Sequence, residues 1–93
     1  MTEQEAKMFA QLLAQRARAA AWMRETDKIA LMRSVGSDAG AAAAKLEPHI
    51  LGPLRRELMQ AREEISEPFV NGFLFGVLEV LASWSTGGST GGQ

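Results

Sequence analysis

The segment from Phe69 to Trp84 constrains the fold more than any other part of the chain. It holds three of the four Phe residues, one of the two Trp residues and no basic side chain. On a helix with about 100° between successive residues, its apolar side chains form one arc that covers roughly two-thirds of the circumference. A helix with so wide an arc has to be covered on several sides. It is therefore the centre of the fold, a protein–protein interface or a membrane-associated element.

The membrane alternative fits this segment poorly. Residues 69–84 are fewer than the roughly 20 apolar residues that span a bilayer. Glu79 lies inside the segment, and the acidic residues that precede the segment are poorly suited to a membrane surface. The remaining helices are too short and too rich in alanine to cover the whole arc. We therefore expect part of the arc to form a protein–protein interface and argue against a membrane partner.

Helical periodicity and capping residues predict an all-α fold, a small bundle of four to five helices. Thr2 followed by Glu5 matches a capping box at the start of the first helix. Gly36 is expected to end the second helix, and Pro48 and Pro53 are expected to bend the chain before the fourth. The predicted helices span residues 3–24, 27–35, 38–47, 50–65 and 67–84.

The last nine residues differ in composition from the rest of the chain. Residues 85–93 contain the sequence Ser-Thr-Gly-Gly twice and have no side chain that could bury much apolar area. We expect them to form a disordered, flexible tail. Residues 1–84 are then expected to form a single helical domain, because a chain of this length makes one domain at most.

Charge and cysteine content argue against several classes of function. The formal net charge of −1 provides no field that would draw the protein to nucleic acid or to anionic lipid. The absence of Cys removes a disulfide scaffold, a thiolate nucleophile and the usual ligands of a structural zinc ion. The acidic, polar N-terminal sequence is unlike a signal peptide. These features together predict a cytoplasmic protein.

No pattern of residues in the sequence points to catalysis. His49 is the only histidine, and it has no suitably placed Asp or Ser nearby to complete a triad. Glu47 and His49 lack the Glu-x-x-His spacing of a carboxylate di-metal site. The run of Glu63, Glu64 and Glu67 is typical of a solvated face. We therefore expect a non-enzymatic protein with no cofactor and no metal site.

Residues 29–41 offer a further alternative, a weak helix-turn-helix that binds nucleic acid. A glycine in the turn, Gly36, followed by Ser37 as a cap is typical of this motif. The second helix would present mostly Ala and Gly to the bases, with Asp38 facing the phosphates and Lys45 as its only basic residue. Bidentate contacts to bases are not available in such a helix. The sequence therefore argues against nucleic acid as the partner.

The leading hypothesis is a protein–protein interaction module, namely an assembly, adaptor or inhibitory subunit. It is expected to dock or self-associate through its last helix and the apolar face of its first helix. The partner is another protein or a second copy of the chain, and the alternative is a small structural subunit of a larger multi-chain particle. Aromatic and Met side chains dominate the energetic centres of interfaces. The expected interface residues are Trp22, Met23, Phe69, Phe73, Val77 and Trp84.

Four further residues are candidates for helix–helix contacts. Gly72 and Gly76 lie one turn apart, which lets a second helix approach closely or accommodates a bulky neighbour of the same chain. Arg16 lies at the centre of the apolar stripe of the first helix, and Glu79 lies inside the apolar last helix. We hypothesise that Arg16 and Glu79 meet at a partly buried contact, within one chain or between two. In the alternative interpretation, both side chains are exposed to solvent.

Overall fold

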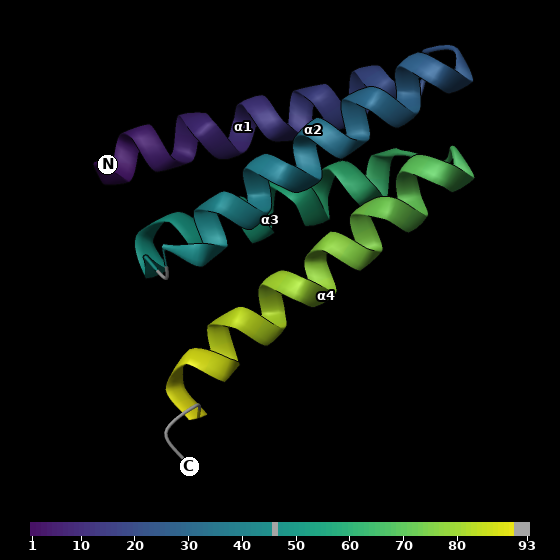
Figure 1. Ribbon diagram of the computed structural model, residues 1–93. Helices are drawn as coiled ribbons and strands as arrows, with labels where there is room; N and C mark the ends of the chain where they lie inside the picture. The colour runs from purple at the N-terminus through teal and green to yellow at the C-terminus, as the bar shows by residue number, and fades with distance from the viewer. Residues whose placement is uncertain (46, 91–93) are drawn as a thin grey trace.

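The computed structural model describes the backbone of residues 1–45 and 47–90 and the side chains of these residues as far as position 84. Over these residues the protein is all-helical, which confirms the predicted fold class. Its four helices are α1 (Glu3–Ala20), α2 (Glu25–Ala44), α3 (Pro48–Glu64) and α4 (Pro68–Thr90). Successive helices run in opposite directions along the bundle, and α4 lies at an angle to the other three (Figure 1).

The two helices predicted between residues 27 and 47 are one continuous helix, α2. Gly36, which was expected to end a helix, lies in the middle of α2. A Cβ atom at Gly36 would lie 3.1 Å from the ring of Phe73, so the missing side chain lets α4 approach α2 closely. The glycine thus serves a close contact between helices and not a change of backbone direction. For the same reason, the helix-turn-helix interpretation of residues 29–41 is wrong.

The start of α1 confirms the predicted capping box. The backbone N–H of Glu5 donates to the Thr2 hydroxyl at 3.1 Å, and the N–H of Thr2 donates to the Glu5 carboxylate at 2.8 Å. The prediction for the other end of the helix is wrong, because α1 ends at Ala20 and not at residue 24. There the N–H of Trp22 donates to the carbonyl of Ala19, and this bond between residues three apart closes a turn that leads into α2.

The proline residues affect α3 less than the sequence suggests. α3 begins at Pro48, where a missing N–H costs nothing in the first helical turn, and it continues through Pro53. The chain is therefore helical over the segment that was expected to bend.

The last helix is longer than its predicted range. The backbone of α4 is helical to Thr90, whereas the sequence predicts an end at residue 84. The prediction of a disordered tail over residues 85–93 is wrong for residues 85–90, whose backbone belongs to α4, and residues 91–93 lie outside the described residues.

The core combines small residues on α1 with larger aliphatic residues on the other helices. α1 contributes mainly alanine side chains, and all of the following are fully buried: Ala6, Ala10, Ala14, Ala17 and Ala20. Leu54 and Leu58 of α3 and Leu74 of α4 fill the space between the helices. α1 makes its most extensive contact with α3, whereas α4 packs on α3 and α2 and makes few contacts with α1. One side of α4 is therefore left without a neighbour among the other three helices.

The close approach at Gly36 can be tested with a matched pair of substitutions in α2. Nothing lies within 4 Å of a Cβ atom added at Gly40, so Gly40→Leu is expected to raise the free energy of unfolding by about 0.5–1 kcal/mol through helix propensity. Gly36→Leu has the same propensity gain but displaces the Phe73 ring, so a net loss of about 1–3 kcal/mol is expected. Urea denaturation measures both values. Equal effects at the two positions would contradict the close contact between α2 and α4.

Candidate functional site

Large apolar side chains of α4 remain exposed although the helix belongs to the bundle. Val70, Leu74 and Leu81 are buried and anchor α4 to its neighbours. On either side of this buried stripe, the following side chains are between 40% and 52% exposed: Phe69, Phe75, Val80 and Trp84. The chain therefore covers the middle of the wide apolar arc and leaves its edges in contact with solvent.

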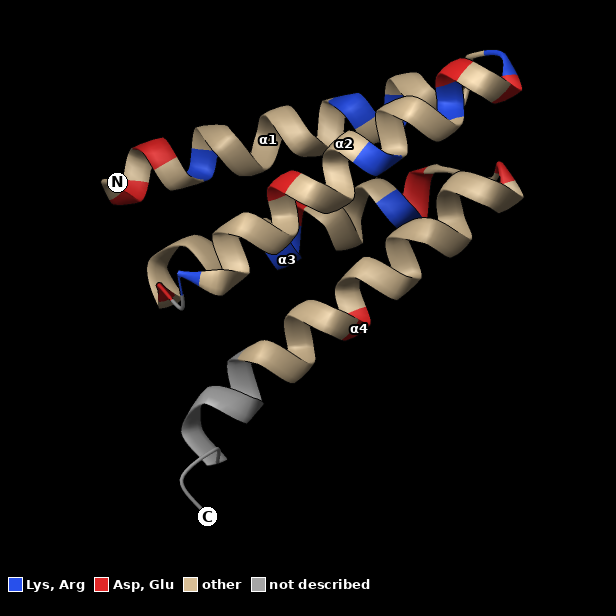
Figure 2. Cartoon of the chain, in the orientation of Figure 1, with Lys and Arg blue, Asp and Glu red and all other residues tan. Residues whose placement is uncertain are grey.

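The exposed residues lie on two different flanks of α4. At about 100° per residue, Phe75 lies on one flank together with Leu78 and Ala82, and Val80 and Trp84 lie on the other. α4 is almost uncharged in Figure 2, with one acidic residue, Glu79, among its described side chains.

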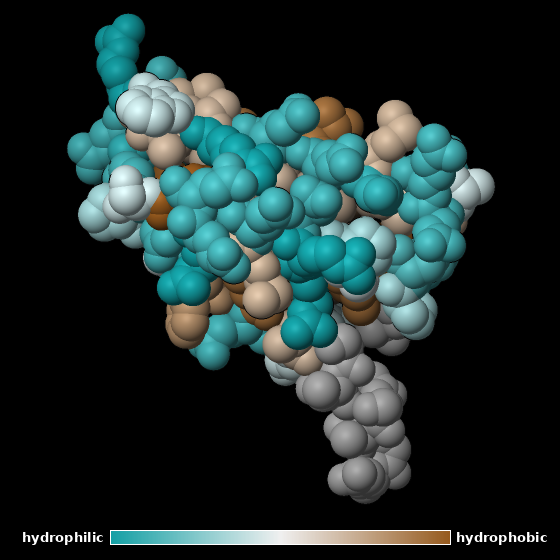
Figure 3. All heavy atoms as spheres, turned by 180° about the vertical axis from the view of Figure 1, so that it is seen from behind, coloured by the Kyte–Doolittle hydropathy of each residue, from teal (hydrophilic) through white to brown (hydrophobic). Residues whose placement is uncertain are grey.

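The flank that carries Phe75 forms one wall of a groove between α3 and α4, here called the α3–α4 groove. The groove has a volume of about 310 Å³ and is lined by Met59, Arg62, Glu63, Phe75, Leu78, Glu79 and Ala82. Met59 of α3 is 50% exposed and Phe75 of α4 is 48% exposed. Seen from behind in Figure 3, hydrophilic atoms cover most of the molecule, and apolar atoms show between them at its upper and lower edges. The groove is lined by both apolar and charged side chains.

Hydrogen bonds between α3 and α4 fix the position of Arg62 at the edge of the groove. The guanidinium carbon of Arg62 lies 4.9 Å from the centre of the Phe75 ring, a cation–π contact. The Arg62 Nε–H donates to the Asn71 carbonyl at 3.4 Å, and the Asn71 amide donates to the Arg62 carbonyl at 3.0 Å. Among the described residues, Arg62 forms no ion pair with a carboxylate, and neither do Glu63 and Glu79 with a base. Three charges at the groove are therefore available to a partner.

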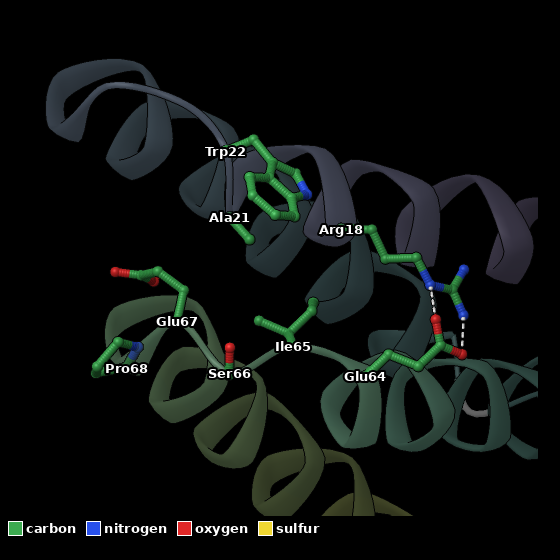
Figure 4. A pocket seen from close by; sticks show the side chains of 8 residues that line it. All are labelled: Arg18, Ala21, Trp22, Glu64, Ile65, Ser66, Glu67 and Pro68. Atoms are coloured by element: carbon green, nitrogen blue, oxygen red, sulfur yellow. Dashed lines mark hydrogen bonds and ion pairs between the residues drawn. The ribbon is translucent and has the colours of Figure 1, made fainter.

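A second hollow lies at the end of the bundle where the α1–α2 turn meets the α3–α4 connection. It has a volume of about 520 Å³ and is lined by Arg18, Ala21, Trp22, Glu64, Ile65, Ser66, Glu67 and Pro68. Figure 4 shows the Trp22 ring projecting over the hollow from the α1–α2 turn. The Trp22 side chain is 90% exposed, so few atoms of the protein hold the ring in place.

The charges around this second hollow already have partners within the chain. Arg18 makes two hydrogen bonds to Glu64, at 2.9 and 3.2 Å. The carboxylate of Glu67 accepts from the Val70 N–H at 2.7 Å and from Lys28 at 2.9 Å. The hydrogen bond from Val70 and the smaller contribution of Lys28 hold the pKa of Glu67 below its ordinary value of 4.5. These groups cap α4 and link the helices, so the hollow offers a ligand little beyond the exposed indole.

The six expected interface residues do not form one patch. Trp22, Met23, Phe69 and Trp84 are exposed, whereas Phe73 and Val77 are half-buried and pack against the core. Trp22 lies at the end of the bundle where α4 begins, and Trp84 lies about 24 Å from that end along α4, at about 1.5 Å per residue. The sequence prediction also omitted Phe75 and Val80, although both belong to the apolar arc. Their position at the edges of the arc was the signal that could have identified them.

The glycines expected at a helix contact make no such contact with the other described residues. Among these residues, nothing lies within 4 Å of a Cβ atom added at Gly72 or Gly76, and both glycines are exposed. They lie on the side of α4 that faces away from the bundle, so they accommodate no side chain from the described part of α1, α2 or α3.

The hypothesis that Arg16 meets Glu79 within one chain is wrong. The Arg16 Nη1 lies 2.6 Å from the Asp38 carboxylate of α2, and Glu79 is exposed on α4. The physical reason is that α1 and α4 make few contacts, while α1 and α2 lie side by side.

The described residues show little that could support chemistry. The His49 Nε2 lies 2.7 Å from the Met1 carbonyl and 3.6 Å from the Glu47 carboxylate. In the part of the chain that the structure describes, His, Cys, Asp and Glu side chains form no group of three or more that could hold a metal ion. Over the same part, every helix is too short or too polar to cross a membrane. Comparisons with models of protein families, with curated proteins and with solved structures found no match.

Proposed function

We propose that this chain is a non-enzymatic protein–protein interaction module that docks through α4 and the α3–α4 groove. The observation that carries the proposal is the exposure of Phe75 and Val80, which are 48% and 52% exposed on a helix that is otherwise part of the core. Aromatic side chains that become buried on binding supply much of the energy of protein interfaces. The function is therefore that of an assembly, adaptor or inhibitory subunit.

The proposal depends on where the exposed apolar residues lie and not on how many of them there are. Single apolar side chains on a protein surface are ordinary and need no explanation. Here Met59, Phe75 and Leu78 line one groove together with the charged residues Arg62 and Glu79. An apolar centre with a polar rim is the usual composition of a protein–protein interface.

A second candidate is a small structural subunit of a multi-chain particle. It is favoured by the presence of exposed apolar residues on both flanks of α4, Phe75 on one and Val80 with Trp84 on the other. Two flanks allow one copy to contact two neighbours, as an open array requires. The mass of the assembly separates the candidates, because an array grows with concentration and a closed complex does not.

The proposal predicts that making α4 more polar abolishes association. The double variant Phe75→Ser, Val80→Ser is expected to weaken binding at least about tenfold, because it removes apolar side chains from both flanks. The control is Met8→Ser, Leu12→Ser on α1, whose side chains are each 55% exposed. Light scattering after size-exclusion chromatography measures self-association, and affinity capture with each variant measures binding to other proteins.

Two results would contradict the proposal. One is a wild-type protein that remains monomeric and captures no protein. The other is an α4 variant that matches the wild type in mass and in captured proteins. Circular dichroism shows whether each variant keeps its helices, which separates loss of binding from loss of the fold.

A further inference from the structure

We propose that the α3–α4 groove binds a second copy of this chain, with Arg62 of each copy paired with Glu79 of the other. This inference rests on the proposed function and names the partner of the same surface. The observation behind it is that one groove is lined by both members of a complementary pair of charges, and neither member forms an ion pair among the described residues.

The two charges lie on the two different helices that line the groove. Arg62 projects from α3, and Glu79 projects from α4. Neither forms an ion pair within the described part of the chain, although both line the same groove. A two-fold axis that passes between the two charges, perpendicular to the line that joins them, lays Arg62 of one copy over Glu79 of the other. Each cation then meets the anion of the other copy, and the symmetry makes this contact twice.

Contacts with α4 of the same chain hold Arg62 in place before any partner binds. Its Nε–H donates to the Asn71 carbonyl, and its guanidinium group lies over the Phe75 ring. A side chain that is fixed before binding loses less conformational entropy when the complex forms. The planar guanidinium group also has further N–H donors for a carboxylate of the second copy.

The apolar residues between the two charges suit the same arrangement. Met59 and Phe75 are each about half-exposed and both line the groove. In a two-fold pair they close on the same residues of the second copy, which removes all four side chains from water. The groove, at about 310 Å³, has room for a large side chain from the other copy.

The remaining charges do not oppose the pairing strongly. Glu63 follows Arg62 in the sequence and therefore points about 100° further around α3. The protein as a whole has a net charge of −1, so two copies repel each other little. Pairing between copies thus needs no compensating ion or partner.

Two charge-reversal variants, measured separately and then as a mixture, test this arrangement. Arg62→Glu and Glu79→Arg each place like charges against each other twice in a pair, so each variant alone is expected to raise the dimer dissociation constant at least about tenfold. An equimolar mixture of the two variants is expected to restore dimerisation, because both contacts then join opposite charges. Sedimentation at several concentrations measures the dissociation constants. Arg33→Glu on α2, an exposed position with the same change of charge, is the control and is expected to leave the dimer unchanged.

The results that would overturn the inference are specific. A wild-type protein that is monomeric up to about millimolar concentration, roughly the weakest affinity of interest, excludes the dimer. A mixture that stays as dissociated as the separate variants shows that Arg62 and Glu79 do not meet between copies. If Arg62→Glu unfolds the chain, the Glu79→Arg variant alone tests the pairing. A dissociation constant of Glu79→Arg equal to that of the wild type would then contradict the pairing. A monomeric wild type whose captured proteins depend on Phe75 and Val80 would overturn this inference and leave the proposed function standing.

Discussion

Replacement of Leu58 by alanine is expected to lower the free energy of unfolding by about 2–5 kcal/mol. Leu58 lies in α3, is fully buried and belongs to the core that joins the helices. Its removal takes away apolar contacts and leaves a cavity that the surrounding helices close only in part. A domain of this size has a total stability of about 5–15 kcal/mol, so the loss is a large share of it.

The adjacent residue supplies the control for this experiment. Met59 is 50% exposed, so Met59→Ala is expected to change the stability by about 0.5 kcal/mol or less. Urea denaturation followed by circular dichroism measures both variants. Similar losses of stability for Leu58→Ala and Met59→Ala would contradict the orientation of α3 in the structure, in which Leu58 faces the core and Met59 is half-exposed.

Replacement of Ala17 by leucine is expected to destabilise the protein by about 1–3 kcal/mol, although leucine is larger and more apolar. Ala17 is fully buried on α1, the helix that makes its most extensive contact with α3. Ala17 has no exposed surface, so the larger leucine side chain has to displace the residues that surround it. Thermal unfolding followed by circular dichroism measures the effect.

The matched control for Ala17→Leu is Ala19→Leu, two residues further along the same helix. Ala19 is exposed, so the added side chain meets solvent and the stability should stay within about 0.5 kcal/mol of the wild type. A stabilising effect of Ala17→Leu would indicate unfilled space between α1 and α3, and would contradict the tight packing described above.

Several features of the fold could be predicted because they depend on residues close together in the sequence. The capping box of Thr2 and Glu5 joins groups three residues apart, and it forms as predicted. The apolar arc on α4 follows from helical periodicity, and its central residues Val70, Leu74 and Leu81 are buried. Local hydrogen bonds and periodicity are read directly from the order of residues, which is why these predictions agree with the structure.

Other predictions failed because they depend on which helices become neighbours. Glycine commonly ends a helix, which is why Gly36 was expected to do so. In the structure it lies inside α2, against the Phe73 ring of α4, a helix that lies far along the chain. Arg16 has Asp38 as its partner because α1 lies beside α2, and periodicity within α1 gives no information about that neighbour. For Phe75, periodicity places the residue at the edge of the apolar arc, but only the packing of α4 shows that this edge is exposed.

Helical periodicity and capping residues establish that the chain is helical, where α1 begins, and that α4 carries a wider apolar arc than an ordinary surface helix. The packing of the four helices determines which part of that arc is covered, which charged side chains form no ion pair among the described residues, and where α3 and α4 enclose a groove. The physical reason is that helix formation and capping depend on interactions within a few residues, whereas burial and charge pairing depend on contacts between helices that are distant in the chain.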